Sequence, residues 1–495
     1  MISISFEERV GIGLQYILEN LHGCSPFGQE RIRRLRYYAP EERAALEAEL
    51  DNTARAAASV ASCRDLMDRI MLELCRMKDI RTSIRRCEEG TCLDHVELFE
   101  LKGFVQRIEN LKPLLAEWIE AAKLTGLSLH DPNPVLDVLD PEATRSRGFY
   151  IPDGASEALR AVRKAKKRIE EQLYHAETDA ERDALKLQRT RICADEETEE
   201  RAVRAAMCRT LAPYAEDLLE DAETIGQIDF LIQKALFAAR YGCVRPQLSD
   251  TELELIDMVN PELVDLLAEK GRKFIPVSIA LEKGAAVITG ANMGGKSVAL
   301  KTIALIALLG QAGFCVPARS AKLPMFFCIK MLFNDMQSIQ SGLSGFGSEI
   351  VQFEQALSEV EQGYSLFLLD EFARGTNPDE GAVIVQAVAK YLNGINAISV
   401  LSTHYDRVAD AANRHYQIIG LRDVDPKDIA REIGIGTEDG VAAIARHMNY
   451  GLYRVEGKAD CPKDALNICR MLSLKPEILA QIETLHASAD AFGED

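Results

Sequence analysis

A glycine-rich segment in the second half of the chain has the composition of a phosphate-binding loop. Residues 290–297 read Gly-Ala-Asn-Met-Gly-Gly-Lys-Ser and match the pattern G-x-x-x-x-G-K-S. Glycines let backbone N–H groups close around phosphate oxygens, and the N-terminus of a following helix adds partial positive charge. Lys296 would place a cation on the β- and γ-phosphates, and the Ser297 hydroxyl would coordinate Mg²⁺. The segment therefore predicts a site for ATP with Mg²⁺.

Two carboxylates and a histidine follow apolar segments further along the chain. Asp370 and Glu371 come directly after Leu366–Leu369, and His404 comes after Leu401–Thr403. Asp370 is suited to the magnesium shell, and Glu371 is suited to orient or deprotonate the attacking water. A strand-end acid pair can instead cap a helix, and a single histidine is more often structural than catalytic. The phosphate loop upstream favours the catalytic interpretation of Glu371 and a γ-phosphate contact for His404.

Strands and helices must bring these residues to one edge of a sheet. Ala285–Thr289, Leu366–Leu369 and Ala397–Leu401 have strand character, and Val298–Leu309 has the pattern of a helix. Such alternation predicts a parallel-rich sheet with covering helices, and ligands bind at the carboxyl ends of its strands. We therefore predict an α/β P-loop ATPase domain over residues 246–495.

The first half of the chain has a helical pattern. Glu41–Met67 and Leu98–Leu124 have apolar residues at three-to-four spacing and few glycines or prolines. Turn-forming residues at 130–134 and again near Pro152 mark a boundary. We therefore predict an all-α core domain over residues 1–150.

A charged helical stretch follows this boundary and opens at Ser156. Its narrow apolar stripe predicts an extended, partly exposed hairpin, with the turn inside the polar stretch His175–Thr198. Further helices are expected at Glu199–Ala222 and Ile225–Tyr241, where Arg245-Pro246 ends the helical region. Residues 151–245 are therefore predicted to form long, lever-like helices.

Composition restricts the class of protein. The chain has 495 residues, 47% hydrophobic and 27% charged, which is typical of a globular protein, and it has no run of 18 apolar residues. With acids near its N-terminus instead of the bases of a signal peptide, we expect a cytoplasmic protein without a membrane partner. The net charge of −19 disfavours nucleic-acid binding by the whole surface. Local basic clusters at Arg31–Arg36 and Arg163–Arg168 are either solvated helix faces or phosphate contacts.

The motifs together resemble those of the MutS family of ATPases, a branch of the ABC-type P-loop proteins. Thr289–Ser297 is similar to the family's T-G-P-N-M-G-G-K-S, with alanine in place of the proline. Asp370–Thr376 resembles its D-E-x-x-R-G-T segment, and Thr403–Tyr405 resembles its T-H-Y. Residues 335–346 look like the family's signature segment. The resemblance is strong over Pro246–Leu485 and rests only on the pattern and order of helices before that.

The resemblance implies a homodimer or a heterodimer with a paralogous chain. In this family the signature serine, here Ser344, and a helix N-terminus reach the γ-phosphate bound by the other subunit. The residues expected to bind the nucleotide are Gly290, Asn292, Met293, Gly294, Gly295, Lys296, Ser297 and Ser344. Ser297 and Asp370 are expected to hold the metal, and Glu371 and His404 to act at the reacting phosphate.

Two functions are open for such a chain. The first is a dimeric ATPase related to mismatch repair, which binds duplex or branched DNA through backbone contacts between lever helices. The second is an ATP-driven protein-remodelling or reactivating factor, for example for a cobalamin-dependent aminomutase. The family's prevailing activity favours the first function, and the acidic net charge favours the second. We expect a short form without mismatch reading, because Phe6-Glu7-Glu8 satisfies the family's F-x-E triplet without a surrounding domain to present it.

Overall fold

The computed structural model describes residues 2–141, 150–290, 295–333, 345–405, 407–422, 447–456, 469, 474–475, 477–482 and 484–485. The chain divides into two compact units that interleave along the sequence. The α/β unit contains the residues up to Leu21, Arg36–Ala54 and the residues from Phe237 onward, and the helical unit contains His22–Leu35 and Arg55–Leu236. The sequence had predicted contiguous segments with bounds at 150 and 245, so the two short N-terminal segments that join the α/β unit were not foreseen.

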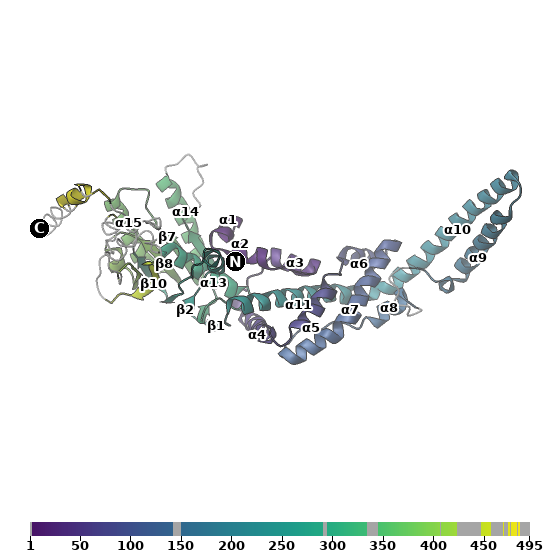
Figure 1. Ribbon diagram of the computed structural model, residues 1–495, viewed down its shortest axis with the longest axis horizontal. Helices are drawn as coiled ribbons and strands as arrows, with labels where there is room; N and C mark the ends of the chain where they lie inside the picture. Colours follow the sequence, from purple (N-terminus) through teal and green to yellow (C-terminus); the bar gives the residue numbers. More distant parts are fainter. Residues whose placement is uncertain are drawn as a thin grey trace. The chain divides into compact units, whose positions relative to one another are not determined.

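The α/β unit contains two sheets (Figure 1). Its strands are β1 (Gln247–Ser249), β2 (Leu253–Met258), β3 (Val277–Leu281), β4 (Gly284–Thr289), β5 (Ser320–Pro324), β6 (Cys328–Leu332), β7 (Ser365–Asp370), β8 (Ala397–Thr403), β9 (Arg414–Gly420) and β10 (Asn449–Arg454). Its helices are α1 (Phe6–Gly11), α2 (Leu14–Asn20), α12 (Pro261–Glu269), α13 (Lys296–Gln311), α14 (Gly345–Val360) and α15 (Pro378–Leu392).

The main sheet confirms the predicted parallel-rich α/β fold. Within the described residues its strand order is β10-β9-β4-β8-β7-β6, and only the β9–β10 pair is antiparallel. Every residue of β4, β7 and β8 is buried, as expected for central strands covered on both faces. Helix α13 is buried over most of its surface, which agrees with its apolar residues lying all around the helix. The smaller sheet has the order β1-β5-β2-β3.

The helical unit is all-α, which confirms the helical pattern of the first half. Its helices are α3 (Pro26–Arg33), α5 (Arg64–Leu74), α6 (Arg81–Glu88), α7 (His95–Ala122), α8 (Asn133–Leu139), α9 (Glu157–His175) and α10 (Asp179–Leu211). Helices α4 (Arg43–Ser59) and α11 (Ala215–Tyr241) contribute residues to both units. None of the helices in the described ranges is long and apolar enough to cross a membrane.

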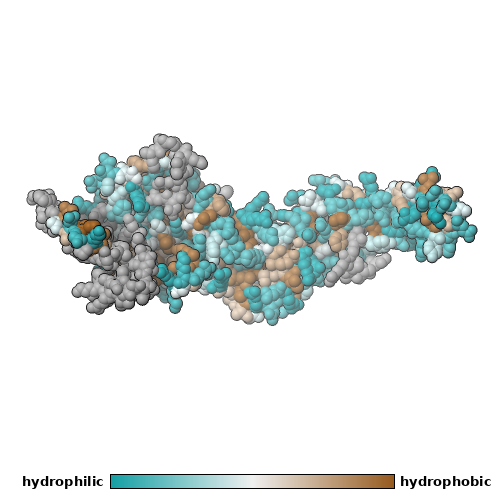
Figure 2. All heavy atoms as spheres, turned by 45° about the horizontal axis from the view of Figure 1, so that its top comes forward, coloured by the Kyte–Doolittle hydropathy of each residue, from teal (hydrophilic) through white to brown (hydrophobic). Residues whose placement is uncertain are grey.

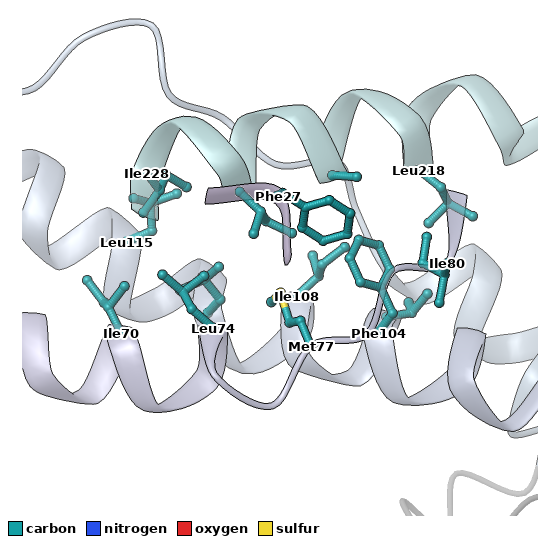
Figure 3. Close-up of a cluster of buried hydrophobic side chains, with 14 of the residues drawn as sticks. Phe27, Ile70, Leu74, Met77, Ile80, Phe104, Ile108, Leu115, Leu218 and Ile228 are labelled. Carbon is teal, nitrogen blue, oxygen red and sulfur yellow. The ribbon is translucent and has the colours of Figure 1, made fainter. Parts of the chain in front are cut away.

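A large apolar core packs most helices of the helical unit together. Figure 3 shows side chains from α3, α5, α7 and α11 meeting in it, with Phe27 and Phe104 edge to face at a centroid distance of 6.0 Å. Helix α7 begins at a capping box between Asp94 and Glu97, and its apolar residues recur at three-to-four spacing down to Trp118. The apolar stripe of α7 thus contributes a large share of a core to which several other helices also contribute.

The hairpin of α9 and α10 differs in its turn from the sequence prediction. Ser156 caps α9 as expected, but the connection occupies only residues 176–178, and α10 then runs through the polar stretch. That stretch is rich in Glu, Arg and Ala, which are strong helix formers even where no residue is buried. Helix α10 ends at Leu211 because Pro213 has no N–H to continue it, so α11 begins at Ala215 and not at Ile225.

Candidate nucleotide site

The carboxyl ends of three adjacent strands bring the predicted site residues together. Thr289, the last residue of β4, pairs with Thr403 of β8, and Asp370, the last residue of β7, pairs with Ser402. The phosphate loop, the acid pair and His404 therefore follow neighbouring strands at the same edge of the sheet. These residues therefore lie at the carboxyl edge of one parallel sheet, which is where they were expected from the sequence.

Lys296 lies at the base of the loop and is almost completely buried. Gly295 precedes it with a φ of 86°, which is left-handed backbone that suits glycine, and α13 begins at Lys296 itself. The Lys296 ammonium donates to the Gly290 carbonyl at 2.7 Å, and its side chain is 3% exposed. The ammonium also lies 3.8 Å from a carboxylate oxygen of Glu371. A buried cation next to a helix N-terminus is the arrangement that binds phosphates.

The two carboxylates lie in different surroundings. Asp370 is buried and accepts a short hydrogen bond from the Ser402 hydroxyl. That hydroxyl in turn accepts from the Glu371 N–H at 3.1 Å. The Glu371 carboxylate lies between two cations. Its Oε1 is 3.8 Å from the Lys296 ammonium, and its Oε2 accepts from the Arg374 guanidinium at 2.8 Å. Ser402 therefore fixes the backbone between the acids, while the Glu371 side chain points toward Lys296.

The backbone after β7 is held in an uncommon conformation. Glu371 has a φ of 48° and Ala373 a φ of 63°, both in the left-handed region that non-glycine residues avoid. The Ala373 N–H donates to a carboxylate oxygen of Glu349 at 3.1 Å, and its carbonyl accepts from the Tyr405 hydroxyl at 3.0 Å. Burial raises the pKa of the Glu349 carboxyl. Strain of this kind persists where surrounding contacts fix the backbone, as Glu349 and Tyr405 do here.

His404 is exposed at the same edge. Desolvation by the surrounding protein lowers the pKa of His404, the nearby charges of Lys296 and Arg374 act in the same direction, and Glu371 opposes them. The imidazole is therefore neutral at neutral pH, and a neutral ring keeps one donor and one acceptor nitrogen. The neighbouring Tyr405 ring lies 4.6 Å from it, centroid to centroid.

A network on the other side of the loop was not found by sequence reasoning. The Thr289 hydroxyl lies 2.8 Å from the His415 Nε2 and accepts from the Gln417 amide at 3.4 Å. The Tyr453 hydroxyl donates to Gln417 from β10. Burial lowers the pKa of His415. No local motif marks these residues, because only strand pairing brings β9 and β10 to the residue before the loop.

An apolar pocket opens beside the phosphate loop. Its volume is about 500 Å³, and its mostly apolar lining includes Leu263, Leu267, Phe274, Ile275, Met448 and Tyr450 together with Gly295, Arg272 and Lys273. A Cβ on Gly295 would lie 3.0 Å from the Tyr450 ring, so the loop and the pocket wall are in contact. The size and apolar lining suit a planar nucleobase next to a phosphate site. The sequence did not reveal this pocket, because its residues come from separate segments.

Four of the predicted site residues lie outside the described ranges, namely Asn292, Met293, Gly294 and Ser344. Ser297 is half-buried in the first turn of α13, directly after Lys296. Among the described residues there is no group of three or more His, Cys, Asp or Glu side chains that could hold a metal ion by themselves. One hydroxyl and one carboxylate, Ser297 and Asp370, nevertheless fit Mg²⁺, which commonly takes few protein ligands and completes its shell with phosphates and water.

Comparison with known protein families agrees with this geometry. Residues 286–473 match the family model described as MutS domain V. This part of the chain belongs to the MutS domain V family. MutS domain V is an ATPase domain, which implies that this part of the chain binds ATP.

Matching relatives include endonucleases and a mismatch repair protein, of which this chain covers only a part. The chain is 36% identical to "Endonuclease MutS2" of Geobacillus sp. (strain WCH70) over 198 residues, which are 39% of this chain and 24% of that protein. It is 35% identical to "Endonuclease MutS2" of Thermomicrobium roseum over 208 residues, 40% of this chain and 26% of that protein. It is 29% identical to "DNA mismatch repair protein MutS" of Leptospira interrogans over 329 residues, 63% of this chain and 37% of that protein. The chain thus spans between a quarter and somewhat over a third of these relatives.

Proposed function

We propose that this chain binds ATP with Mg²⁺ and hydrolyses it, with Glu371 as the residue that orients and deprotonates the attacking water. The observation that supports this most strongly is the position of the Glu371 carboxylate between Lys296 and Arg374 at the end of β7. Lys296 and the N-terminus of α13 would hold the β- and γ-phosphates, and the apolar pocket would hold the base. Ser297 and Asp370 would hold Mg²⁺, which neutralises phosphate charge when it is bound. His404, as a neutral imidazole, would donate to the γ-phosphate.

We propose further that ATP turnover drives conformational change in a dimer whose sites are completed in trans. Ser344, which lies outside the described residues, and the beginning of α14 would face the nucleotide of a second copy or of a paralogous chain. Glu349 on α14 already contacts the strained backbone next to Glu371, at Ala373. A change at the γ-phosphate would therefore reach α14 through one hydrogen bond.

The ligand that we favour is duplex or branched DNA, bound through its phosphates. On α9, the side chains of Arg160, Lys164, Lys167 and Arg168 are exposed and recur at helical spacing, so they share one face. Two other members of the predicted basic cluster do not contribute. Arg163 is paired with Asp153, Glu196 and Glu200, and Lys166 is paired with Glu196. The predicted cluster is thus partly structural, and the phosphate-binding face is narrower than the sequence indicated.

A protein client is the second candidate, and it is supported by a different feature of the hairpin. Tyr174 and Leu187 are 86% and 58% exposed on α9 and α10. Figure 2 shows a mostly hydrophilic hairpin surface with a hydrophobic patch near its tip. Exposed aromatic and aliphatic side chains are typical anchors of protein interfaces, and the net charge of −19 repels polyanions elsewhere.

The deciding experiment measures which ligand raises the ATPase rate. We expect duplex or junction DNA to stimulate the wild-type chain, and we expect Lys164→Ala/Lys167→Ala to lose this stimulation and to bind DNA with a weaker salt dependence. The control is Lys283→Ala/Lys390→Ala, which removes the same charge from exposed positions of the α/β unit. Absence of DNA binding at low salt, with stimulation by a protein client that is lost in Tyr174→Ala, would favour the second candidate.

A further inference from the structure

One carboxylate on α12 joins the wall of the apolar pocket to two other helices of the α/β unit, beside the hydrogen bond that Asn260 at the start of α12 donates to the Ile12 carbonyl. Helix α12 contributes Leu263 and Leu267 to the pocket, one turn apart on the same face. Asp265 lies between them in sequence and therefore on the opposite face of the helix. Its Oδ2 accepts from the Tyr16 hydroxyl at 2.6 Å, the Tyr241 hydroxyl at 2.6 Å and the Arg240 guanidinium at 2.8 Å.

These three donors come from two other helices of the same unit. Tyr16 belongs to α2, and Arg240 and Tyr241 form the last turn of α11. Although burial acts in the opposite direction, the hydrogen bonds from both tyrosines and the charge of Arg240 lower the pKa of Asp265. The carboxylate is therefore charged at neutral pH, and hydrogen bonds to a charged acceptor are among the stronger ones in proteins.

We propose that Asp265 is a positioning residue for the nucleotide base. By fixing the outer face of α12 to α2 and α11, it keeps Leu263 and Leu267 where they close the pocket beside Gly295. The inference rests on the proposed nucleotide function of that pocket. It assigns to Asp265, Tyr16 and Tyr241 a role in the affinity for the base, with no contact to the phosphates.

The physical argument is a shift in population. If α12 can leave its position, the apparent dissociation constant rises in inverse proportion to the fraction of molecules with a closed pocket. Removing two hydrogen bonds to a charged acceptor weakens the hold on α12, while Arg240 still donates to Asp265, so we expect that fraction to fall by about tenfold. The phosphate loop lies between β4 and α13 in the sequence, and Lys296 begins α13, so we expect its affinity for phosphates to be retained when α12 moves.

The test compares a ligand that has a base with one that has only phosphates. In Tyr16→Phe/Tyr241→Phe, both rings keep their packing and only the two hydroxyls are lost. We expect ADP binding to weaken about tenfold, while the binding of inorganic pyrophosphate stays as in the wild type. Asp265→Asn is the second variant, with the same expected direction. Tyr391→Phe is the matched control, because it removes a tyrosine hydrogen bond to Glu361 at 2.6 Å on the surface of the same unit.

Circular dichroism and the thermal midpoint establish that each variant is folded. Unchanged ADP affinity in the folded double variant would overturn the positioning role, and so would an equal loss of ADP and pyrophosphate binding. If the wild-type protein binds pyrophosphate and ADP equally well, the pocket does not hold the base and the inference is wrong. If the wild type binds neither ligand, the proposed nucleotide site itself is refuted.

Discussion

Replacing Glu371 with glutamine tests the proposed chemistry with the smallest structural change. The substitution keeps the volume of the side chain and replaces one carboxylate oxygen with an NH₂ group, so that a neutral amide stands in place of the carboxylate. In the structure one Glu371 oxygen lies 3.8 Å from the Lys296 ammonium, and the other accepts from Arg374 at 2.8 Å. Glu371→Gln therefore removes both the proposed base and a negative charge beside the phosphate site.

The loss of the base and the loss of the charge affect different quantities: the first lowers the hydrolysis rate, and the second does not weaken ATP binding. Loss of a positioned base slows hydrolysis by roughly two to four orders of magnitude. Two unit charges 3.8 Å apart interact by about 4 kcal/mol at an effective dielectric constant of about 20. In the variant this attraction no longer competes with phosphate for Lys296, so ATP binding is retained or becomes tighter.

The assay measures phosphate release at saturating ATP and the equilibrium binding of labelled ATP on the same preparations. Glu380→Gln, an exposed carboxylate in the first turn of α15, is the control and is expected to behave as the wild type. Turnover within about threefold of the wild type in Glu371→Gln would refute the assignment of the base. The water would then be activated elsewhere, and His404→Ala would be the next variant to examine.

Phosphate binding, assembly, stability and DNA binding can each be tested separately. Lys296→Ala is expected to abolish tight ATP binding, because among the described residues no other buried cation lies beside the Gly290 carbonyl to balance the phosphate charge. Unchanged ATP affinity in a titration would contradict the phosphate-loop assignment. Sedimentation of Glu371→Gln is expected to show a dimer that tightens with ATP, whereas a monomer in both conditions, with wild-type activity proportional to concentration, would contradict a composite site. Burial lowers the pKa of His130, but Asp221 and two other nearby acids outweigh burial and raise it above its usual value. The charged His130 therefore stabilises the fold below about pH 6.5, and this stabilisation is lost as the pH rises through the folded-state pKa. We expect His130→Ala to lower the urea midpoint more at about pH 6 than at about pH 9. Mismatched and matched duplexes are expected to compete within about tenfold, because Glu8 of the F-x-E triplet is engaged in a cap with Ser5; a larger preference would show that the chain reads mismatches.

Much of the site could be predicted from short segments, because each has its own chemical signature. The glycine loop, the acid pair and His404 all follow apolar strands, and their spacing in the chain indicated an edge of a parallel sheet. The strands expected at Ala285–Thr289 and Ala397–Leu401 are β4 and β8. The roles assigned to Glu371 and His404 remain predictions, which the variants above address.

The elements predicted least well are those whose boundaries depend on partners. The stretch His175–Thr198 has no apolar face, and its polar composition suggested a turn, yet its strong helix formers and its pairing with α9 make it part of α10. Two N-terminal segments have the same helical pattern as their neighbours but belong to the α/β unit, namely the residues up to Leu21 and the segment Arg36–Ala54. Helical periodicity reports that a face is buried and does not report which unit buries it.

The sequence by itself indicated the chemistry to be expected of this protein, since the patterns of a phosphate loop, of a candidate metal-binding acid and of a candidate base depend on residue type and local order. Only the tertiary structure decided how those residues are supported. The Ser402 hydroxyl that joins Asp370 to the Glu371 backbone, the network around Thr289 and the Asp265 attachment of α12 each connect residues far apart in the chain. Such contacts leave no local pattern, because their energy depends on geometry between elements and not on the order of residues within one element.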